Sequence, residues 1–162
     1  MKMSNNEDCI FCKIVKGKVP CYKIYENKKF LAILDIFPNT TGAALVLSKK
    51  HYNSDIFQMP TKEYSEIMQT TKKVVELLKK ALLVERVGII VEGMGVNHAH
   101  IKLYPMRGLG KEWKPVFAGD EVFYEKYPGF LTSATGPKAK YEDLKELSER
   151  ISKLAKEIKK EK

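Results

Sequence analysis

Polar and apolar residues alternate from position 98 to position 103. On a β-strand, His98, His100 and Lys102 would share one face, because successive side chains point to opposite sides of a sheet. The other face would carry only apolar side chains, those of Ala99, Ile101 and Leu103. A row of basic groups does little for folding, so it indicates a site for a negatively charged substrate, with the His100 imidazole opening onto a cleft. The alternative interpretation is a solvated sheet face.

A second candidate site is the Cys-x-x-Cys sequence formed by Cys9 and Cys12. In a reducing cell such a pair binds metal or carries out redox chemistry. Its place ahead of a predicted hairpin, and not within a βαβ unit, favours metal. Zinc takes four nitrogen or sulfur ligands, and His51 and His98 are the candidates for the other two. The alternative is a pair of buried free cysteines, and Cys21 is expected to be an unliganded thiol.

The elements that would position these residues follow from the hydrophobic pattern. The sequence predicts strands at residues 23–25, 30–34, 43–47, 87–91 and 99–104, the first two joined in a hairpin. A helix with apolar residues at helical spacing is predicted from residue 61, with Thr61 as its cap. Residues 141–162 predict a final helix whose narrow apolar stripe packs on the body of the protein or on a partner subunit. Trp113 and Tyr124, between the last strand and this helix, are expected to be packing residues.

Together these elements predict an α+β fold: a mostly antiparallel five-stranded sheet, one long helix and a C-terminal helical extension. A chain of 162 residues is most simply one compact unit. We expect residues 1–110 to form the main domain, and residues 111–162 to form an extended segment and a C-terminal helix packed on it.

The composition narrows the class of partner. The net charge of +9 suits acidic ligands such as nucleotides, but no basic stripe with interleaved aromatic residues indicates nucleic acid. Neither a secretory signal nor a membrane span is expected. Three cysteines argue against a disulfide framework, so we expect a cytoplasmic protein.

Four segments resemble the histidine triad (HIT) family of nucleotide hydrolases and transferases, which share a His-x-His-x-His motif. They are residues 8–17, residues 30–36 with their terminal Asp35-Ile36, residues 45–51 ending in His51, and the histidine segment itself. The resemblance runs from about residue 9 to residue 105 and keeps the family's order of elements. It implies the HIT-like fold, a five-stranded antiparallel sheet with two helices, and usually a homodimer.

The resemblance also implies roles for individual residues. His100, at the middle motif position, would be the nucleophile that attacks a nucleotide α-phosphate, and Asp35 would bind the ribose. Phe11, Ile14 and Ile36 would line the base pocket of a purine nucleotide or nucleotide conjugate. The zinc-bearing branch of the family matches this chain at four positions, which would hold a structural zinc ion: Cys9, Cys12, His51 and His98. His98 would also belong to the catalytic face.

Two positions depart from the family pattern. Lys102 replaces the third histidine; its ammonium can neutralise phosphate charge, and burial could turn it into a proton donor. The alternative is that Lys102 extends to solvent and supports no catalysis. Met94 and Gly95 stand where the family has Gln and Ser, so that main-chain amides near Gly95 would contact the phosphate. The resemblance therefore implies a nucleotide hydrolase, with a nucleotidylyltransferase, a phosphorylase or a non-catalytic nucleotide-binding protein as alternatives.

Overall fold

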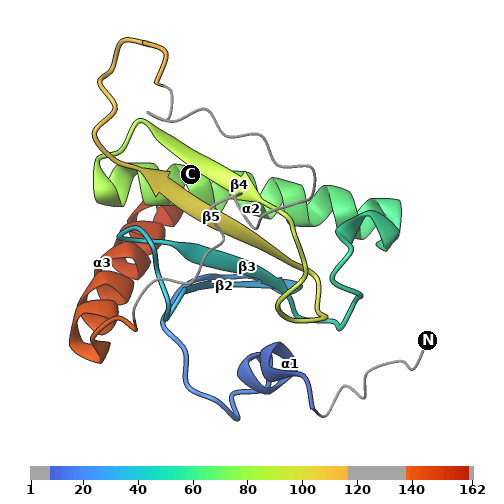
Figure 1. Cartoon of the computed structure of the whole chain (residues 1–162). Coiled ribbons are helices and arrows are strands. Elements are labelled where there is room, and N and C mark those ends of the chain that lie inside the picture. Colours follow the sequence, from blue (N-terminus) through green and yellow to red (C-terminus); the bar gives the residue numbers. More distant parts are fainter. Residues whose placement is uncertain (1–7, 117–137, 161–162) are drawn as a thin grey trace.

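The computed structural model describes residues 8–116 and 138–160 (Figure 1). At its centre, five strands form one sheet in the order β1-β2-β3-β5-β4, with every neighbouring pair antiparallel. The strands are β1 (Lys23–Glu26), β2 (Phe30–Leu34), β3 (Ala44–Ser48), β4 (Arg86–Ile90) and β5 (His100–Met106). The predicted α+β fold is confirmed, and each strand lies within two residues of its expected bounds.

The helices are α1 (Ile10–Val15), the 3-10 helix η1 (Ile56–Gln58), α2 (Thr61–Leu82) and α3 (Tyr141–Lys160). The two long helices were predicted from the sequence, whereas α1 and η1 were not. The prediction that Thr61 caps α2 is wrong: Thr61 is its first helical residue, and Pro60 holds the cap position without a side-chain hydrogen bond. The backbone at Pro60 is extended, with a ψ of 141°, and the helix begins directly after it.

Both faces of the central strands are covered, which explains why β2 and β3 are buried along their whole length. On one face Val46, Ile101 and Leu103 pack against α2 and α3 in the main core. On the other face Leu45 and Leu47 form a smaller core with Phe11 of α1. Figure 1 shows α1 on the side of the sheet opposite the two long helices. Because side chains alternate along β5, the residues between its core positions face α1.

Helix α3 covers the outer strand β1. Leu144 and Ile151 of its predicted stripe are buried in the main core, and the side chain of Ile158 is outside the described part. The hydroxyls of Ser148 and Ser152 both donate to the main-chain carbonyl of Lys23, at 2.6 and 2.8 Å. The stripe thus packs on the body of the protein. Among the helices that the structure describes, none has an apolar stretch able to cross a membrane.

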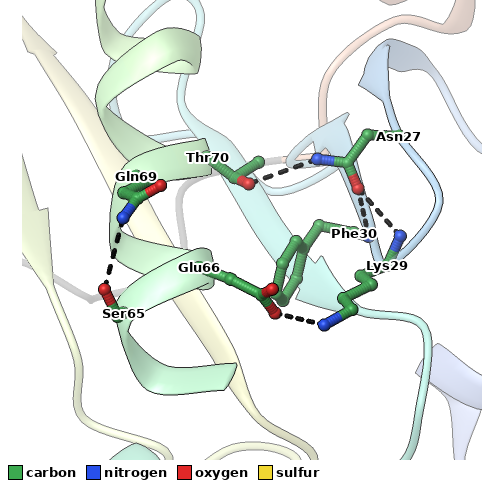
Figure 2. Close-up of polar contacts among 7 residues, drawn as sticks. All are labelled: Asn27, Lys29, Phe30, Ser65, Glu66, Gln69 and Thr70. Atoms are coloured by element: carbon green, nitrogen blue, oxygen red, sulfur yellow. Dashed lines mark hydrogen bonds and ion pairs between the residues drawn. The ribbon is translucent and has the colours of Figure 1, made fainter. Parts of the chain in front are cut away.

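The turn between β1 and β2 is tied to α2 by one side chain (Figure 2). Asn27 Oδ1 accepts hydrogen bonds from the main-chain N–H groups of Lys29 and Phe30, at 2.9 and 2.8 Å. Its Nδ2 donates to Thr70 Oγ1 at 3.2 Å, and beside it Lys29 forms an ion pair with Glu66. The turn therefore joins the edge of the sheet to the helix that covers it.

The expectation that Trp113 packs into the structure is wrong, because its side chain is 73% exposed. Residues 113–116 belong to no helix or strand and run along the surface. Tyr124 lies outside the described residues.

Candidate functional site

Four side chains that are far apart in the sequence meet beside α1: Cys9, Cys12, His51 and His98, here called the Cys/His cluster. Their ligand atoms all lie within 4.8 Å of one another. His98 Nδ1 is 3.4 Å from Cys9 Sγ and 3.5 Å from Cys12 Sγ, and His51 Nδ1 is 3.3 Å from Cys12 Sγ. The cysteines come from the start and the first turn of α1, while His51 follows β3 and His98 precedes β5. The structure brings together all four residues that the sequence analysis selected.

The spacing of these atoms fits a tetrahedral zinc ion. With Zn–S near 2.3 Å and Zn–N near 2.05 Å, a tetrahedron places a sulfur and a nitrogen ligand about 3.5 Å apart. The three sulfur–nitrogen distances of the cluster, 3.3 to 3.5 Å, agree with this value. Two thiolates and two imidazoles are also a ligand set that zinc prefers. The Cys/His cluster therefore could hold a metal ion, and its chemistry suits zinc.

His98 has the tautomer that a metal ligand needs. Its Nε2 lies 2.7 Å from the main-chain carbonyl oxygen of Ser48, which can only accept a hydrogen bond. Nε2 must therefore carry the proton, and in the neutral ring the lone pair is on Nδ1, which faces the two sulfur atoms. Burial lowers the pKa of His98 to about 4; the hydrogen bond to Ser48 opposes this in part, and the nearby His51 and His100 lower the pKa further. The ring is consequently neutral near pH 7.

His100 is the first residue of β5. Its Nδ1 donates a hydrogen bond to the main-chain carbonyl of His98 at 2.6 Å, which leaves the lone pair on Nε2. Burial lowers the pKa of His100; the hydrogen bond to His98 raises it, and among the charged neighbours Lys102 lowers it. The expectation that His98 belongs to the strand is wrong, because its main-chain N–H bonds to Val96 O in the preceding turn.

His100 is enclosed by its neighbours, and the cavities described among residues 8–116 and 138–160 do not include the open cleft expected in front of it. His100 is only 3% exposed, and the ring of Phe11 packs edge-on against it with a centroid distance of 5.1 Å. Of the two cavities described, one of about 320 Å³ lies between α3 and the loop after β2, and the other lies beside α2, the start of β4 and the segment after β5. Neither is lined by His100. The Phe11 ring thus covers part of this imidazole.

Charged groups surround His100. Lys102 follows it on the same strand and pairs with Ile90 of β4, so the same register places Glu92 opposite His100. Both Lys102 and Glu92 are half-buried, and Glu92 and Asp35 raise the pKa of His100. Sequence reasoning missed Glu92. Its signal was that residues 87–91 and 99–104 were predicted as consecutive strands of a mostly antiparallel sheet, so that a residue just after the first strand can lie opposite the start of the second.

The residues assigned to nucleotide binding lie on the α1 side and at the end of β2. Phe11 is buried, and Ile14 packs at the margin of the smaller core. Asp35 follows β2, and its carboxylate accepts a hydrogen bond from the main-chain N–H of Phe37 at 2.9 Å. Ile36 is 39% exposed.

The loop before His98 is held by contacts that the sequence did not reveal. Gly93 is buried with a φ of +71°, and a Cβ there would lie 2.8 Å from Ser54 O. Asn97 Oδ1 accepts a hydrogen bond from Ser54 N at 3.0 Å, so Asn97 fastens the loop. Gly95 is exposed, with no atom within 4 Å of the position of an added Cβ. Its backbone is therefore accessible.

Comparison with known proteins places these features in a family. The HIT domain family matches residues 16–108. A HIT-like protein of Methanocaldococcus jannaschii is 41% identical over 102 residues, which cover 60% of this chain and 78% of that protein. The adenosine 5'-monophosphoramidase of Schizosaccharomyces pombe is 35% identical over 114 residues, which cover 65% and 82% of the two chains.

A solved structure shares the fold. The Zn-bound histidine triad family protein from Mycobacterium smegmatis superposes with a TM-score of 0.69, covering 98% of this chain and all of that one at 22% identity. At this identity the likeness concerns the arrangement of the elements alone.

Proposed function

Because the chain belongs to the HIT (histidine triad) family, we propose that it hydrolyses a phosphoramidate or phosphoanhydride bond at the α-phosphate of a purine nucleotide or nucleotide conjugate. His100 is the nucleophile of this reaction. Three fungal relatives named adenosine 5'-monophosphoramidases support this reaction class.

The observation that carries the proposal is the hydrogen bond from His100 Nδ1 to His98 O, at 2.6 Å. A neutral imidazole with its proton held on Nδ1 presents a lone pair on Nε2, which is the form that attacks phosphorus. Burial lowers the pKa of His100, so this form is present near neutral pH. When Nε2 bonds to phosphorus, the ring becomes positive, and the His98 carbonyl stabilises that charge through the same hydrogen bond.

The reaction balances in two steps. His100 Nε2 bonds to the α-phosphorus, the bond from phosphorus to the leaving nitrogen or oxygen breaks, and the leaving group takes its electron pair and a proton. Water then attacks the same phosphorus, the P–Nε2 bond breaks, and a nucleoside monophosphate leaves while the water proton passes to solvent. For a nucleoside phosphoramidate, the overall reaction is phosphoramidate plus water giving nucleoside monophosphate plus ammonia.

Lys102 serves the phosphate in this proposal. Residues two apart on a strand are about 7 Å apart on the same face, which a lysine side chain spans easily. Its ammonium neutralises charge on the phosphoryl oxygens and supplies the proton that the leaving group takes. Main-chain N–H groups around Gly95 contribute further hydrogen bonds to the phosphate.

Nucleoside binding falls to residues near the end of β2 and on α1. The Asp35 carboxylate, fixed by Phe37 N, accepts hydrogen bonds from the ribose hydroxyls. Phe11, Ile14 and Ile36 contact the base, the Phe11 ring from its place against His100.

The Cys/His cluster binds zinc in this proposal. Bound there, zinc would act as a structural ion that fixes the start of α1 to the sheet. The closeness of the four ligand atoms and the three sulfur–nitrogen distances of 3.3 to 3.5 Å support this assignment. We also expect the protein to be cytoplasmic and to form a homodimer. Size-exclusion chromatography with light scattering would test the dimer.

The test is turnover of adenosine 5'-phosphoramidate by the purified protein, together with His100→Ala. The wild type should release AMP and ammonia, and an adenylyl group should be found on His100 by mass spectrometry after a quench without acid. His100→Ala should lose both and keep its circular dichroism spectrum. Near wild-type turnover in His100→Ala would refute the proposal.

The same assay separates the alternatives. Transfer of AMP to added phosphate or sugar phosphate, in preference to water, would identify a phosphorylase or nucleotidylyltransferase. AMP binding without turnover or adenylyl-histidine would identify a nucleotide-binding protein.

A further inference from the structure

The main chain of His98 connects the Cys/His cluster to the proposed nucleophile. The His98 side chain lies 3.4 and 3.5 Å from the two sulfur atoms, while its carbonyl oxygen accepts the hydrogen bond from His100 Nδ1 at 2.6 Å. His98 is fully buried and is further held by Ser48. A displacement of this imidazole therefore moves the acceptor that orients His100.

Phe11 forms a second connection. It lies between the two cysteines on α1, and its ring packs edge-on against both imidazoles, with centroid distances of 5.7 Å to His98 and 5.1 Å to His100. Helix α1 has six residues and no side-chain cap, so its own hydrogen bonds hold it weakly. A metal ion bound by Cys9 and Cys12, at the start and in the first turn of this helix, would hold both the helix and the Phe11 ring against His100.

From these two connections we propose that the Cys/His cluster, when it holds a metal ion, sets the orientation of His100, with His98 and Phe11 as positioning residues. The inference rests on the proposed function only in taking His100 as the nucleophile. Without metal, only weak hydrogen bonds between the thiols and the imidazoles would hold the four ligand atoms together. The His98 carbonyl and the Phe11 ring would then lose the positions that hold the His100 ring.

The test compares two half-buried cysteines. Cys9→Ser removes a cluster ligand, and Cys21→Ser changes a cysteine outside the cluster that packs against the same smaller core. For each variant we would measure zinc content, kcat with adenosine 5'-phosphoramidate, and the downfield NMR resonance of the His100 Nδ1 proton, assigned by its loss in His100→Ala. The resonance reports the hydrogen bond to His98 directly and needs no turnover.

Cys9→Ser should lose zinc, shift or broaden the Nδ1 resonance, and lower kcat by about 10- to 100-fold, the range typical of residues that orient a site from behind. Cys21→Ser should retain zinc and resemble the wild type in both other measurements. A folded, zinc-depleted Cys9→Ser with an unchanged resonance would overturn the proposal. If Cys9→Ser does not fold, the resonance is followed as zinc is chelated from the wild type and restored.

Failure of the proposed function would look different. A wild type that never hydrolyses the phosphoramidate refutes the role of His100 as nucleophile. The dependence of its Nδ1 resonance on zinc would still decide whether the cluster positions the ring.

Discussion

His98 donates a hydrogen bond from Nε2 to the carbonyl oxygen of Ser48, at 2.7 Å. This contact joins the end of β3 to the segment that leads into β5, and it fixes which ring nitrogen carries the proton. The Nδ1 lone pair then faces Cys9 and Cys12. A main-chain carbonyl behind a ligand imidazole is the usual way in which proteins orient a metal-binding histidine. The relationship supports a metal ligand at position 98.

Cys12→Ser should lower metal content and thermal stability together. The cluster has no equivalent in the unfolded chain, so the free energy of metal binding adds to the free energy of folding. Burial also raises the pKa of the Cys12 thiol, so the neutral thiol persists at pH 7 until a metal displaces its proton. We expect Tm to fall by at least about 5 °C, since a loss of about 2 kcal/mol corresponds to roughly 4–8 °C at this size.

Calorimetry with and without added zinc would measure the effect, with Cys21→Ser as the control. A Cys12→Ser protein with wild-type zinc content would show that the sulfur atom is not a ligand.

Lys102→Ala should lower kcat/KM for adenosine 5'-phosphoramidate by at least about tenfold, because the variant removes the cation proposed to neutralise the phosphoryl oxygens. Lys102→His restores a third histidine at this position and should retain more activity than Lys102→Ala. Steady-state kinetics of both variants at pH 7 would measure the difference. If Lys102→Ala equals the wild type, the ammonium extends to solvent and takes no part in the reaction.

The strands that carry the site could be predicted because their residue patterns are local. Alternation around His100 places Ala99, Ile101 and Leu103 in the main core, as expected, and their neighbours on the opposite face. The helical spacing that ends at Leu82 likewise corresponds to the buried face of α2. The buried face of a strand or helix can be predicted from the residue pattern of that short segment alone.

Features that depend on contacts between residues far apart in the sequence could not be predicted from local patterns. Helix α1 is too short to stand on its own propensity and forms against Leu45 and Leu47 of the sheet. The contact between Phe11 and His100 joins two residues that are far apart in the sequence, so no local pattern predicts it. The Cys/His cluster was an exception. Few residue types bind zinc, so the chemistry of the ligands limited which residues could complete the site.

Asn27→Ala should destabilise the protein by about 1–2 kcal/mol, because it removes three hydrogen bonds and leaves two main-chain N–H groups without their acceptor. Chemical denaturation would measure the change. The ion pair between Lys29 and Glu66, drawn beside it in Figure 2, offers a matched control. Both side chains are partly exposed, so Glu66→Gln should cost at most about 0.5 kcal/mol. Equal effects of the two variants would show that Asn27 does not hold the turn to α2.

Leu83→Gly should stabilise the protein, although it removes a large side chain. Leu83 ends α2 with a φ of +54°, where its Cβ is strained, and its side chain is 91% exposed. Glycine adopts this conformation freely, so we expect a gain of about 0.5–1 kcal/mol and a rise in Tm of roughly 1–4 °C. Leu83→Ala is the control, because it shortens the exposed side chain and keeps the Cβ. A gain as large in Leu83→Ala would trace the effect to the lost apolar surface; a loss in Leu83→Gly would mean that the greater freedom of glycine in the unfolded chain outweighs the relief of strain at this helix end.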